Sequence, residues 1–222
     1  KAKEKLKKLK GDIDILTLTA TPIPRTLNLS LLGIRDLSII DTSPEGRQKI
    51  QTEYIDNNKD LIRDIIITEV SREGQVFYIF NSVKRIEMKS KELREFLPEY
   101  IKVDYIHGQM LARDIKRAIH NFENGNTDVL IATTIIENGI DIENANTMII
   151  EGVEKLGLSQ VYQLRGRIGR SNKKSYCYML MNENKTRNAQ KREESIREFD
   201  NLTGIDLSME DSKIRGVGEI LG

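Results

Sequence analysis

The segment Gln75-Val76-Phe77-Tyr78-Ile79-Phe80-Asn81 reads as a β-strand that is apolar along almost its whole length. A strand with one face in water alternates apolar and polar residues, whereas a strand of a parallel sheet is buried on both faces and forms a continuous apolar run. A second such run, Asp128-Val129-Leu130-Ile131-Ala132-Thr133-Thr134, follows further along the chain. The two runs predict a sheet with helices packed on both of its faces.

Helix-like segments separate the strands. The helix expected at 59–72 has its apolar positions at helical spacing, which predicts that Leu61, Ile62, Ile65, Ile66 and Val70 face the core. The full pattern gives strands at 50–55, 75–81, 102–107, 128–134, 147–150 and 176–181, and helices at 59–72, 83–97, 111–124 and 158–170. This alternation implies an α/β fold with a parallel sheet and right-handed crossovers.

The last of these helices, Leu158-Ser159-Gln160-Val161-Tyr162-Gln163-Leu164-Arg165-Gly166-Arg167-Ile168-Gly169-Arg170, carries a polar face. Gln163, Arg167 and Arg170 are four and three residues apart, so a continuous helix would place them on one side. The guanidinium group of Arg is planar, always charged and matched to phosphate oxygens. We therefore expect this face to meet a polyphosphate or a nucleic-acid backbone.

The opposite side of the same helix is apolar. Val161, Leu164 and Ile168 are spaced three and four apart and form a stripe that can pack on the sheet. Gly166 and Gly169 remove side-chain bulk beside the arginines, although each Gly costs a helix interior roughly 1 kcal/mol relative to Ala. The two glycines suggest that another group, of a kind the sequence does not specify, approaches the backbone closely.

Polar groups also follow three of the expected strands. They are Asn81 after the first apolar run, His107-Gly108 after 102–107, and Thr133-Thr134 with Gly139 and Asp141 after the second run. Ligands of open α/β sheets bind beyond the carboxyl ends of the strands. Each feature also has an ordinary explanation, because a Thr-Thr pair suits a strand and an Asp after Gly suits a turn.

Composition narrows the class of protein. The chain has 222 residues, 38% hydrophobic and 31% charged, with a net charge of +1, so any nucleic-acid surface must come from local arrangement. The single Cys177 excludes an intrachain disulfide and a Cys-rich zinc site, and a buried structural thiol is expected. There is no signal peptide and no membrane-spanning run, and we expect a cytoplasmic fragment of a longer protein.

Taken together, these motifs resemble those of the superfamily 2 helicases and translocases. Ala132–Ile142 is similar to motif V, Gln163–Arg170 to the arginine-finger motif VI, and Val76–Ser82 to motif IV by position. Thr19–Thr26 is similar to motif III, and Arg215–Gly222 to the TRG translocation motif, in the forms shared by RecG and the transcription-repair coupling factors.

The resemblance is closer to the coupling factors than to RecG. The segments that favour them are Gly33–Ile40, Ala145–Ile150 and Arg170-Ser171-Asn172. A RecG-like helicase that remodels replication forks and a non-catalytic nucleic-acid-binding α/β module remain alternatives. A nucleotide-cofactor oxidoreductase is disfavoured, because no Gly-x-Gly-x-x-Gly follows the first strand.

The resemblance implies three regions. Residues 1–43 would be the tail of a first motor lobe and its linker, residues 44–186 a second RecA-like lobe, and residues 187–222 a truncated TRG-like helical element. The whole protein would be an ATP-dependent double-stranded DNA translocase that displaces stalled RNA polymerase in transcription-coupled repair. RNA polymerase and UvrA would bind through domains outside this chain.

The resemblance also assigns roles to residues. Arg167 and Arg170 would reach the ATP γ-phosphate, Gln163 would orient them, and Gly139 and Asp141 would line the nucleotide side of the cleft. The expected DNA contacts are Asn81, His107, Gly108, Thr133 and Thr134. The residues expected to couple hydrolysis to movement are Thr19, Thr21, Arg215, Gly216 and Gly218.

Half of the expected ATP site is missing. The sequence contains no Gly-x-x-x-x-Gly-Lys-Ser/Thr phosphate loop and no Asp-Glu-type magnesium box, and no metal ligand is expected in this chain. In the family both motifs belong to the first lobe, which would hold most of the ATP and its Mg²⁺. We therefore expect the chain alone to bind ATP weakly and not to hydrolyse it.

Overall fold

The computed structural model describes residues 38, 49–137, 142 and 144–181. Within them lie β1 (Gln51–Asp56), α3 (Lys59–Ser71), β2 (Gln75–Phe80), α4 (Ile86–Phe96), β3 (Val103–Ile106), α5 (Ala112–Glu123), β4 (Val129–Ala132), the 3-10 turn η1 (Thr134–Glu137), β5 (Ala145–Glu151), the 3-10 turn η2 (Val153–Lys155), α6 (Leu158–Arg165) and β6 (Tyr176–Met181).

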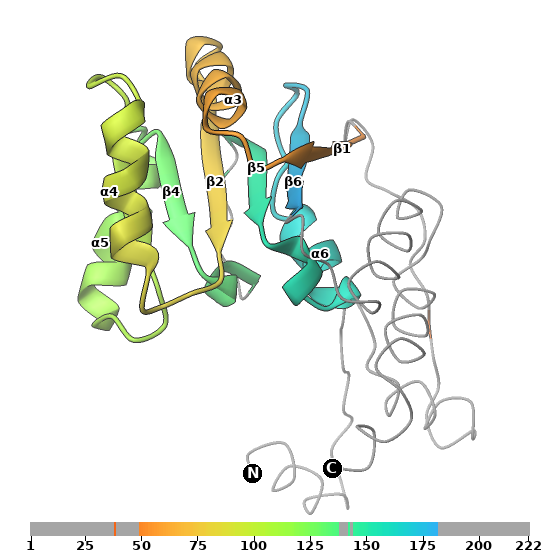
Figure 1. Cartoon of the computed structure of the whole chain (residues 1–222). Coiled ribbons are helices and arrows are strands. Elements are labelled where there is room, and N and C mark those ends of the chain that lie inside the picture. The colour runs from red at the N-terminus through yellow and green to blue at the C-terminus, as the bar shows by residue number, and fades with distance from the viewer. Residues whose placement is uncertain (1–37, 39–48, 138–141, 143, 182–222) are drawn as a thin grey trace, which may run out of the picture.

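The described strands form one six-stranded sheet in the order β1-β6-β5-β2-β4-β3, with every neighbouring pair parallel (Figure 1). The predicted α/β fold with a parallel sheet is therefore confirmed. The two apolar runs became β2 and β4, which are neighbours near the middle of the sheet and are buried along their whole lengths.

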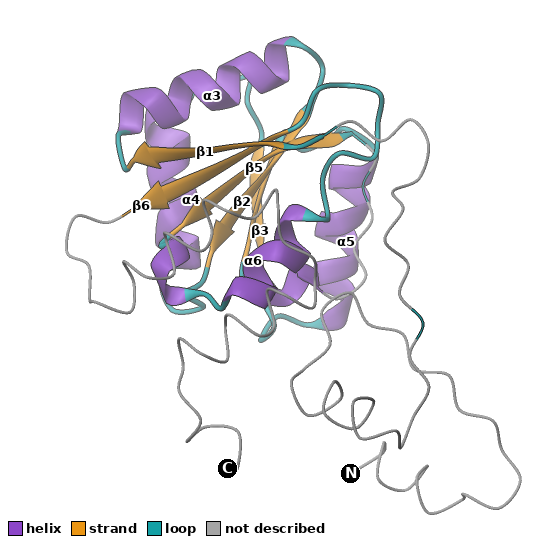
Figure 2. Ribbon diagram, turned by 90° about the vertical axis from the view of Figure 1, so that its right-hand side faces the viewer, coloured by secondary structure: helices purple, strands orange, loops and turns teal. Residues whose placement is uncertain are grey.

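Two layers of helices cover this sheet. Figure 2 shows α3 and α4 on one side and α5 and α6 on the other. Side chains alternate along β2, so that Val76 and Tyr78 join the core beneath α3 and α4, while Phe77 and Ile79 join the core beneath α5 and α6. Burial on both faces explains why the strand is apolar along almost its whole length.

Helix α3 begins where Asn58 caps it, because the Asn58 side chain accepts the backbone N–H of Asp60 at 2.8 Å. Leu61 was predicted to face the core, but it is 40% exposed. The buried stripe is instead centred on Ile62, Ile66 and Glu69, and Leu61 lies about 100° around the helix from Ile62.

At the end of α3, where Gly74 in the sequence predicts a helix stop, the structure differs in detail. The left-handed residue after the helix is Glu73, with φ of 61°. Gly74 is required for space, since a Cβ there would lie 1.6 Å from Glu69 Oε1. A non-glycine residue in this conformation is uncommon and needs support from its surroundings.

Helix α6 is shorter than predicted. The expectation of one continuous helix over 158–170 is wrong, because α6 ends at Arg165 and Gly166 is its C-cap. Gly169 has φ of 77°, so the chain has already left helical geometry there. Arg167 and Arg170 therefore lie in the irregular segment after the helix and not on one helical face with Gln163.

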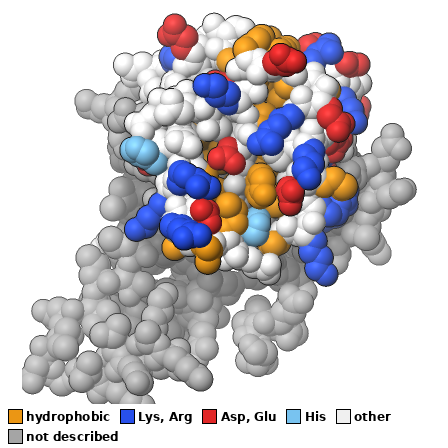
Figure 3. Space-filling model, turned by 90° about the vertical axis from the view of Figure 1, so that its left-hand side faces the viewer, with side chains coloured by type: hydrophobic (Ala, Val, Ile, Leu, Met, Phe, Trp, Pro, Cys, Tyr) orange, Lys and Arg blue, Asp and Glu red, His pale blue; other side chains and the backbone are white. Residues whose placement is uncertain are grey.

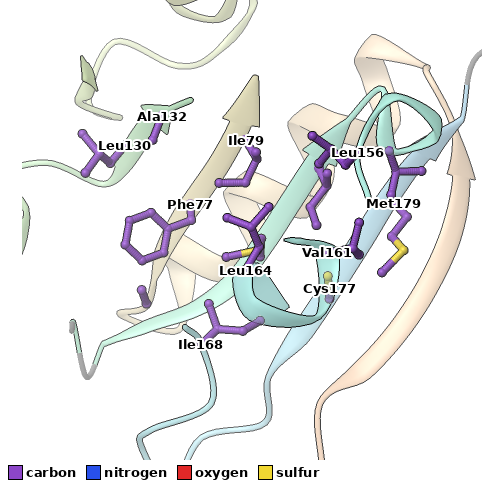
Figure 4. Close-up of a cluster of buried hydrophobic side chains, with 14 of the residues drawn as sticks. Phe77, Ile79, Leu130, Ala132, Leu156, Val161, Leu164, Ile168, Cys177 and Met179 are labelled. Atoms are coloured by element: carbon purple, nitrogen blue, oxygen red, sulfur yellow. The ribbon is translucent and has the colours of Figure 1, made fainter. Parts of the chain in front are cut away.

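The apolar stripe of this region was predicted correctly. Val161, Leu164 and Ile168 are fully buried, and Figure 4 shows them in one cluster with Phe77 and Cys177. The turn after α6 is thus held to the sheet by Ile168, even though it is no longer helical.

Cys177, the only cysteine of the chain, is fully buried in this cluster, as expected for a structural thiol. Burial raises the pKa of the Cys177 thiol to about 12. The thiolate is the reactive form, so we expect a thiol reagent at pH 8 to label the folded protein about 10³-fold more slowly than the protein unfolded in urea. Equal labelling rates in the two states would contradict this burial.

The same shift fixes a pH dependence of stability. The folded-state pKa of Cys177 lies above the value of about 8.5 expected in the unfolded chain. The neutral thiol's contribution to stability is therefore complete below about pH 8.5 and is lost as the pH rises toward 12. The free energy of unfolding of Cys177→Ala, measured with denaturant, should therefore decrease less at alkaline pH than that of the parental protein.

Candidate functional site

The predicted site residues divide between the two ends of the sheet. β5 ends at Glu151 on the carboxyl edge and β6 begins at Tyr176 on the amino edge, so the chain between them must run back across the sheet. α6 forms this return and packs on β5 and β6 through Leu158, Val161 and Leu164. Groups before and after α6 therefore lie toward opposite ends of the strands.

The carboxyl edge gathers the residues predicted to contact DNA. Ala132 is paired with Ile79 on one side and with Ile106 on the other, so the residues that follow these three lie side by side. Adjacent strands are about 4.8 Å apart, which brings Thr133 within two strand spacings of both Asn81 and His107. Asn81 is exposed and His107 is half-buried.

Thr133 is less accessible than a phosphate contact from its side chain would suggest. The residue is 6% exposed, and its backbone N–H donates to the Ile106 carbonyl at 3.4 Å. Thr134 is half-buried at the first position of η1. Of the two hydroxyls, that of Thr134 is therefore better placed to meet a ligand at this edge.

The loop after β3 is shaped around His107. Its ring stacks on Tyr105, with centroids 6.2 Å apart and planes at 12°, and its Nδ1 accepts the Gln109 N–H at 3.3 Å. Gly108 is exposed, and a Cβ there would lie 3.9 Å from Ile135 Cδ1 of η1. Because η1 in turn packs against α6, the loops after β3 and β4 are continuous with α6.

The arginines lie toward the opposite edge. Gln163 is half-buried on α6, Arg167 is half-buried in the turn after it, and Arg170 is exposed. A Cβ on Gly169 would lie 3.1 Å from Ile50 Cγ1 and 3.5 Å from Ser175 Oγ, which places this segment beside the amino ends of β1 and β6. The backbone that carries the two arginines is therefore separated from the residues of the carboxyl edge.

The two glycines of this segment have different functions in the fold. Gly169 has a left-handed φ of 77°, and a Cβ there would make a tight 3.1 Å contact with Ile50, whereas Gly166 has φ of −65° and only ordinary 3.5 Å neighbours. We expect Gly169→Ala to lower the free energy of unfolding by about 1–3 kcal/mol. The matched change Gly166→Ala should stay within about 0.5 kcal/mol. Urea unfolding of both variants measures this, and equal effects would contradict the assignment.

Several predicted residues lie outside the described part of the chain. They are Gly139 and Asp141 on the nucleotide side, and Thr19, Thr21, Arg215, Gly216 and Gly218 among the coupling residues. The expected region 1–43, apart from residue 38, and the expected region 187–222 lie outside it as well.

Sequence reasoning missed an ionic network at the end of β5. The Tyr78 hydroxyl donates to Glu151 Oε2 at 2.6 Å, and Lys89 Nζ lies 3.1 Å from the same oxygen. Burial, followed by the charge of Glu151, raises the pKa of Tyr78 well above its ordinary value, so Tyr78 remains a neutral donor. The network fixes the point where the chain leaves the sheet toward α6. Tyr78 and Glu151 are 73 positions apart in the sequence, so no local pattern reveals it.

Lys89 also joins this network to the surface. Its Nζ lies 3.0 Å from Glu92 Oε2, and Lys59 Nζ lies 3.1 Å from Glu92 Oε1. Burial raises the pKa of Glu92, but the hydrogen bonds from Lys89 and Lys59 outweigh burial and lower it. Glu92 thus stays ionised as the link between the two lysines.

The face of the molecule on the side of α4 and α5 shows Lys and Arg side chains mixed with Asp and Glu (Figure 3). Pairs such as Lys91–Glu87 at 3.0 Å and Arg117–Asp114 at 3.4 Å neutralise one another there.

Among residues 49–137 and 144–181, no group of three or more His, Cys, Asp or Glu side chains is placed to hold a metal ion. The helices of that part also include none long and apolar enough to cross a membrane.

Comparison with known proteins gives a consistent result. Residues 56–172 match the helicase conserved C-terminal domain family. The transcription-repair-coupling factors of Staphylococcus haemolyticus and Staphylococcus aureus are each 48% identical to the chain over 99% of its length. The chain spans 19% of the length of these curated relatives.

Solved structures agree with the sequence relatives. RecG bound to a three-way DNA junction has a TM-score of 0.76 and 34% identity, over 94% of this chain and 28% of that chain. S. cerevisiae Dbp5 bound to RNA and ADP BeF3 has a TM-score of 0.65 at 16% identity, over 95% of this chain and 57% of that chain, which is a likeness of fold alone. The resemblance drawn from the motifs is confirmed.

Proposed function

This chain belongs to the helicase conserved C-terminal domain family, and from that premise we propose that it is the second motor lobe of an ATP-dependent double-stranded DNA translocase. The lobe is assigned to residues 44–186, between the tail of a first lobe at 1–43 and a TRG-like element at 187–222. Because the chain spans 19% of its curated relatives, the activity belongs to a larger motor of which this lobe is one part.

The observation that carries the proposal is the separation of two polar surfaces by α6. Asn81, His107 and Thr134 gather at the carboxyl edge, and Arg167 and Arg170 lie beyond the other end of the helix. A motor must hold nucleotide and DNA at once and connect them mechanically. One short helix packed on the sheet provides such a connection.

At the arginine segment the donor set fits a polyphosphate. Arg167 and Arg170 carry fixed positive charge on a turn pinned by the buried Ile168, so little ordering remains to be done when phosphate arrives. ATP supplies the phosphoryl group whose transfer drives movement, and charge develops on that group during transfer. In this proposal the two guanidinium groups stabilise that charge, Gln163 orients them, and Gly139 and Asp141 line the same side.

At the carboxyl edge the groups fit a nucleic-acid backbone. Backbone N–H groups, amides and hydroxyls contact phosphate without reading base sequence, which is what a translocase requires. The mixed charges on the face shown in Figure 3 supply no broad positive field on that side. Binding of the DNA backbone would therefore depend on the few groups at the carboxyl edge, which are Asn81, His107, Gly108, Thr133 and Thr134. Thr19, Thr21, Arg215, Gly216 and Gly218 would transmit closure of the lobes to the DNA.

The similarity to transcription-repair-coupling factors favours displacement of stalled RNA polymerase as the task of the whole motor, with UvrA as a further partner, both bound by other domains. The test joins this chain to a lobe that carries the phosphate loop and magnesium box. We expect duplex DNA to stimulate ATP turnover of the joined protein and ATP-dependent release of a stalled polymerase, with no turnover by this chain alone.

A RecG-like function is the second candidate, supported by the 34% identity to RecG over 94% of the chain. It predicts ATP-dependent unwinding of a three-way junction without polymerase release. Measuring both reactions on one preparation separates the candidates. Turnover by the isolated chain would instead refute the division of the ATP site between two lobes.

A further inference from the structure

The segment that carries the arginines lacks regular secondary structure. From Gly166 to Ser175 the described chain forms turns and bends between α6 and β6. Ile168 and Gly169 hold the first part of this segment against the sheet. Arg170 is exposed at its middle, and the residues that follow it hold the backbone there by further contacts.

Lys173 makes three of these later contacts. Its Nζ donates to the carbonyl oxygens of Arg72 at 3.0 Å and Glu73 at 2.9 Å, and it reaches Asn144 Oδ1 at 3.5 Å. The two carbonyls belong to the C-terminal end of α3. The last carbonyls of a helix have no N–H partner within the helix, and the helix dipole is negative at this end. An ammonium group at this point satisfies both carbonyls and links the arginine segment to another helix.

Ser171, next to Arg170, makes a second link. Its hydroxyl donates to Asn146 Oδ1 at 2.5 Å and accepts the backbone N–H of Lys173 at 3.2 Å. Asn146 is fully buried at the start of β5, and its Nδ2 donates to the Asn144 carbonyl at 3.0 Å. The same cluster therefore joins the arginine segment to the first residues of β5.

The cluster also supports the left-handed residue that ends α3. Asn144 Nδ2 donates to the Glu73 carbonyl at 2.9 Å, the oxygen that Lys173 also contacts. Glu73 with φ of 61° is thereby held from two sides, which fixes the direction of its carbonyl. The C-terminal end of α3 is therefore held in place by these two hydrogen bonds to the Glu73 carbonyl.

We propose that Lys173 and Ser171 are positioning residues that set the direction of Arg170 for its contact with the γ-phosphate. The proposal rests on the function given above for Arg170. Neither residue lies on α6 or touches phosphate in this proposal, and both act by tying the backbone after Arg170 to α3 and β5. A displacement of about 1 Å at a catalytic group can lower a rate by up to about 10²-fold, so such ties matter to turnover.

The test compares Lys173→Met with Lys174→Met in the complete two-lobe motor. Lys174 is the exposed neighbour, so its replacement removes the same charge without breaking the ties. We expect Lys173→Met to lower kcat for DNA-stimulated ATP hydrolysis by about 10- to 100-fold, with KM for ATP and affinity for duplex DNA changed less than about twofold. Lys174→Met should keep the parental kcat.

Thermal unfolding distinguishes positioning from simple stability. If Lys173→Met loses stability but keeps kcat per folded molecule, the positioning inference is overturned. If the variant is unfolded at the assay temperature, Ser171→Ala provides the same comparison, because it removes the second tie and keeps Lys173. Unchanged kcat in a folded Ser171→Ala would also count against the inference.

Arg170→Ala, assayed in parallel, separates this inference from the proposed function. If Arg170→Ala keeps its turnover, the proposed function fails. If Arg170→Ala loses turnover while Lys173→Met does not, only the positioning inference fails. If both single variants lose turnover, the double variant Arg170→Ala/Lys173→Met should be no slower than Arg170→Ala alone. Once the guanidinium group is gone, Lys173 has no catalytic group to position.

Discussion

Arg170→Ala is expected to lower DNA-stimulated ATP turnover of the complete motor by about 10³-fold or more, the effect of removing an arginine that stabilises a transferring phosphoryl group. Arg170 is exposed on a segment fixed by Ile168 and Gly169, so alanine should remove the charge without unfolding the lobe. Arg167→Ala should act in the same direction. Steady-state turnover with saturating duplex DNA measures the loss.

The control for both variants is Lys174→Ala, which removes an exposed charge four residues beyond Arg170. It should leave turnover unchanged. Affinity for duplex DNA should be largely kept in the arginine variants, since the groups proposed to meet DNA lie at the opposite edge of the sheet. Intact turnover with weakened DNA binding would favour the non-catalytic nucleic-acid-binding module instead.

Arg72→Met is expected to have the largest effect on stability. Arg72 pairs with Glu69, whose side chain is 2% exposed and also accepts the Thr147 hydroxyl. Removing the cation leaves a carboxylate uncompensated in the interior, which typically costs about 3–5 kcal/mol. Urea unfolding at neutral pH, with m-values compared between variants, measures the change.

Two variants check the reason for that loss. Arg63→Met, on the same helix, breaks exposed contacts of 3.6 Å to Asp60 and Asp64 and should cost less than about 1 kcal/mol. The double variant Arg72→Met/Glu69→Gln removes the buried charge together with its partner and should recover much of the stability. Equal losses for Arg63→Met and Arg72→Met would show that burial of Glu69 does not control the effect.

The secondary structure was largely predictable because it is local. Apolar runs such as 75–81 can bury both faces only within a covered parallel sheet, and that inference needed no partner strand. The stripe of Val161, Leu164 and Ile168 was likewise correct, even though the helix that motivated it stops at Arg165. Periodicity reports burial more reliably than it reports where a helix ends.

The site was predictable in its residue types but not in its arrangement. Spacing placed Gln163, Arg167 and Arg170 on one helical face, but the helix ends at Arg165, and Gly169 then turns the chain with a positive φ. A glycine pattern cannot show by itself whether the residue saves space, as Gly74 does above Glu69, or supplies a positive φ, as Gly169 does. The conformation of the surrounding chain decides between these uses.

By itself, the sequence determined the order of strands and helices, the burial of the central strands, the helicase motifs and the single buried thiol, since each depends on residues within a few positions of one another. Only the tertiary structure decided the order β1-β6-β5-β2-β4-β3, the separation of the arginines from the carboxyl edge, and the ties of Lys173 to α3 and of Tyr78 to Glu151. Those contacts join residues 73 and 100 positions apart, and they form only when the sheet has assembled and brought both partners to the same edge.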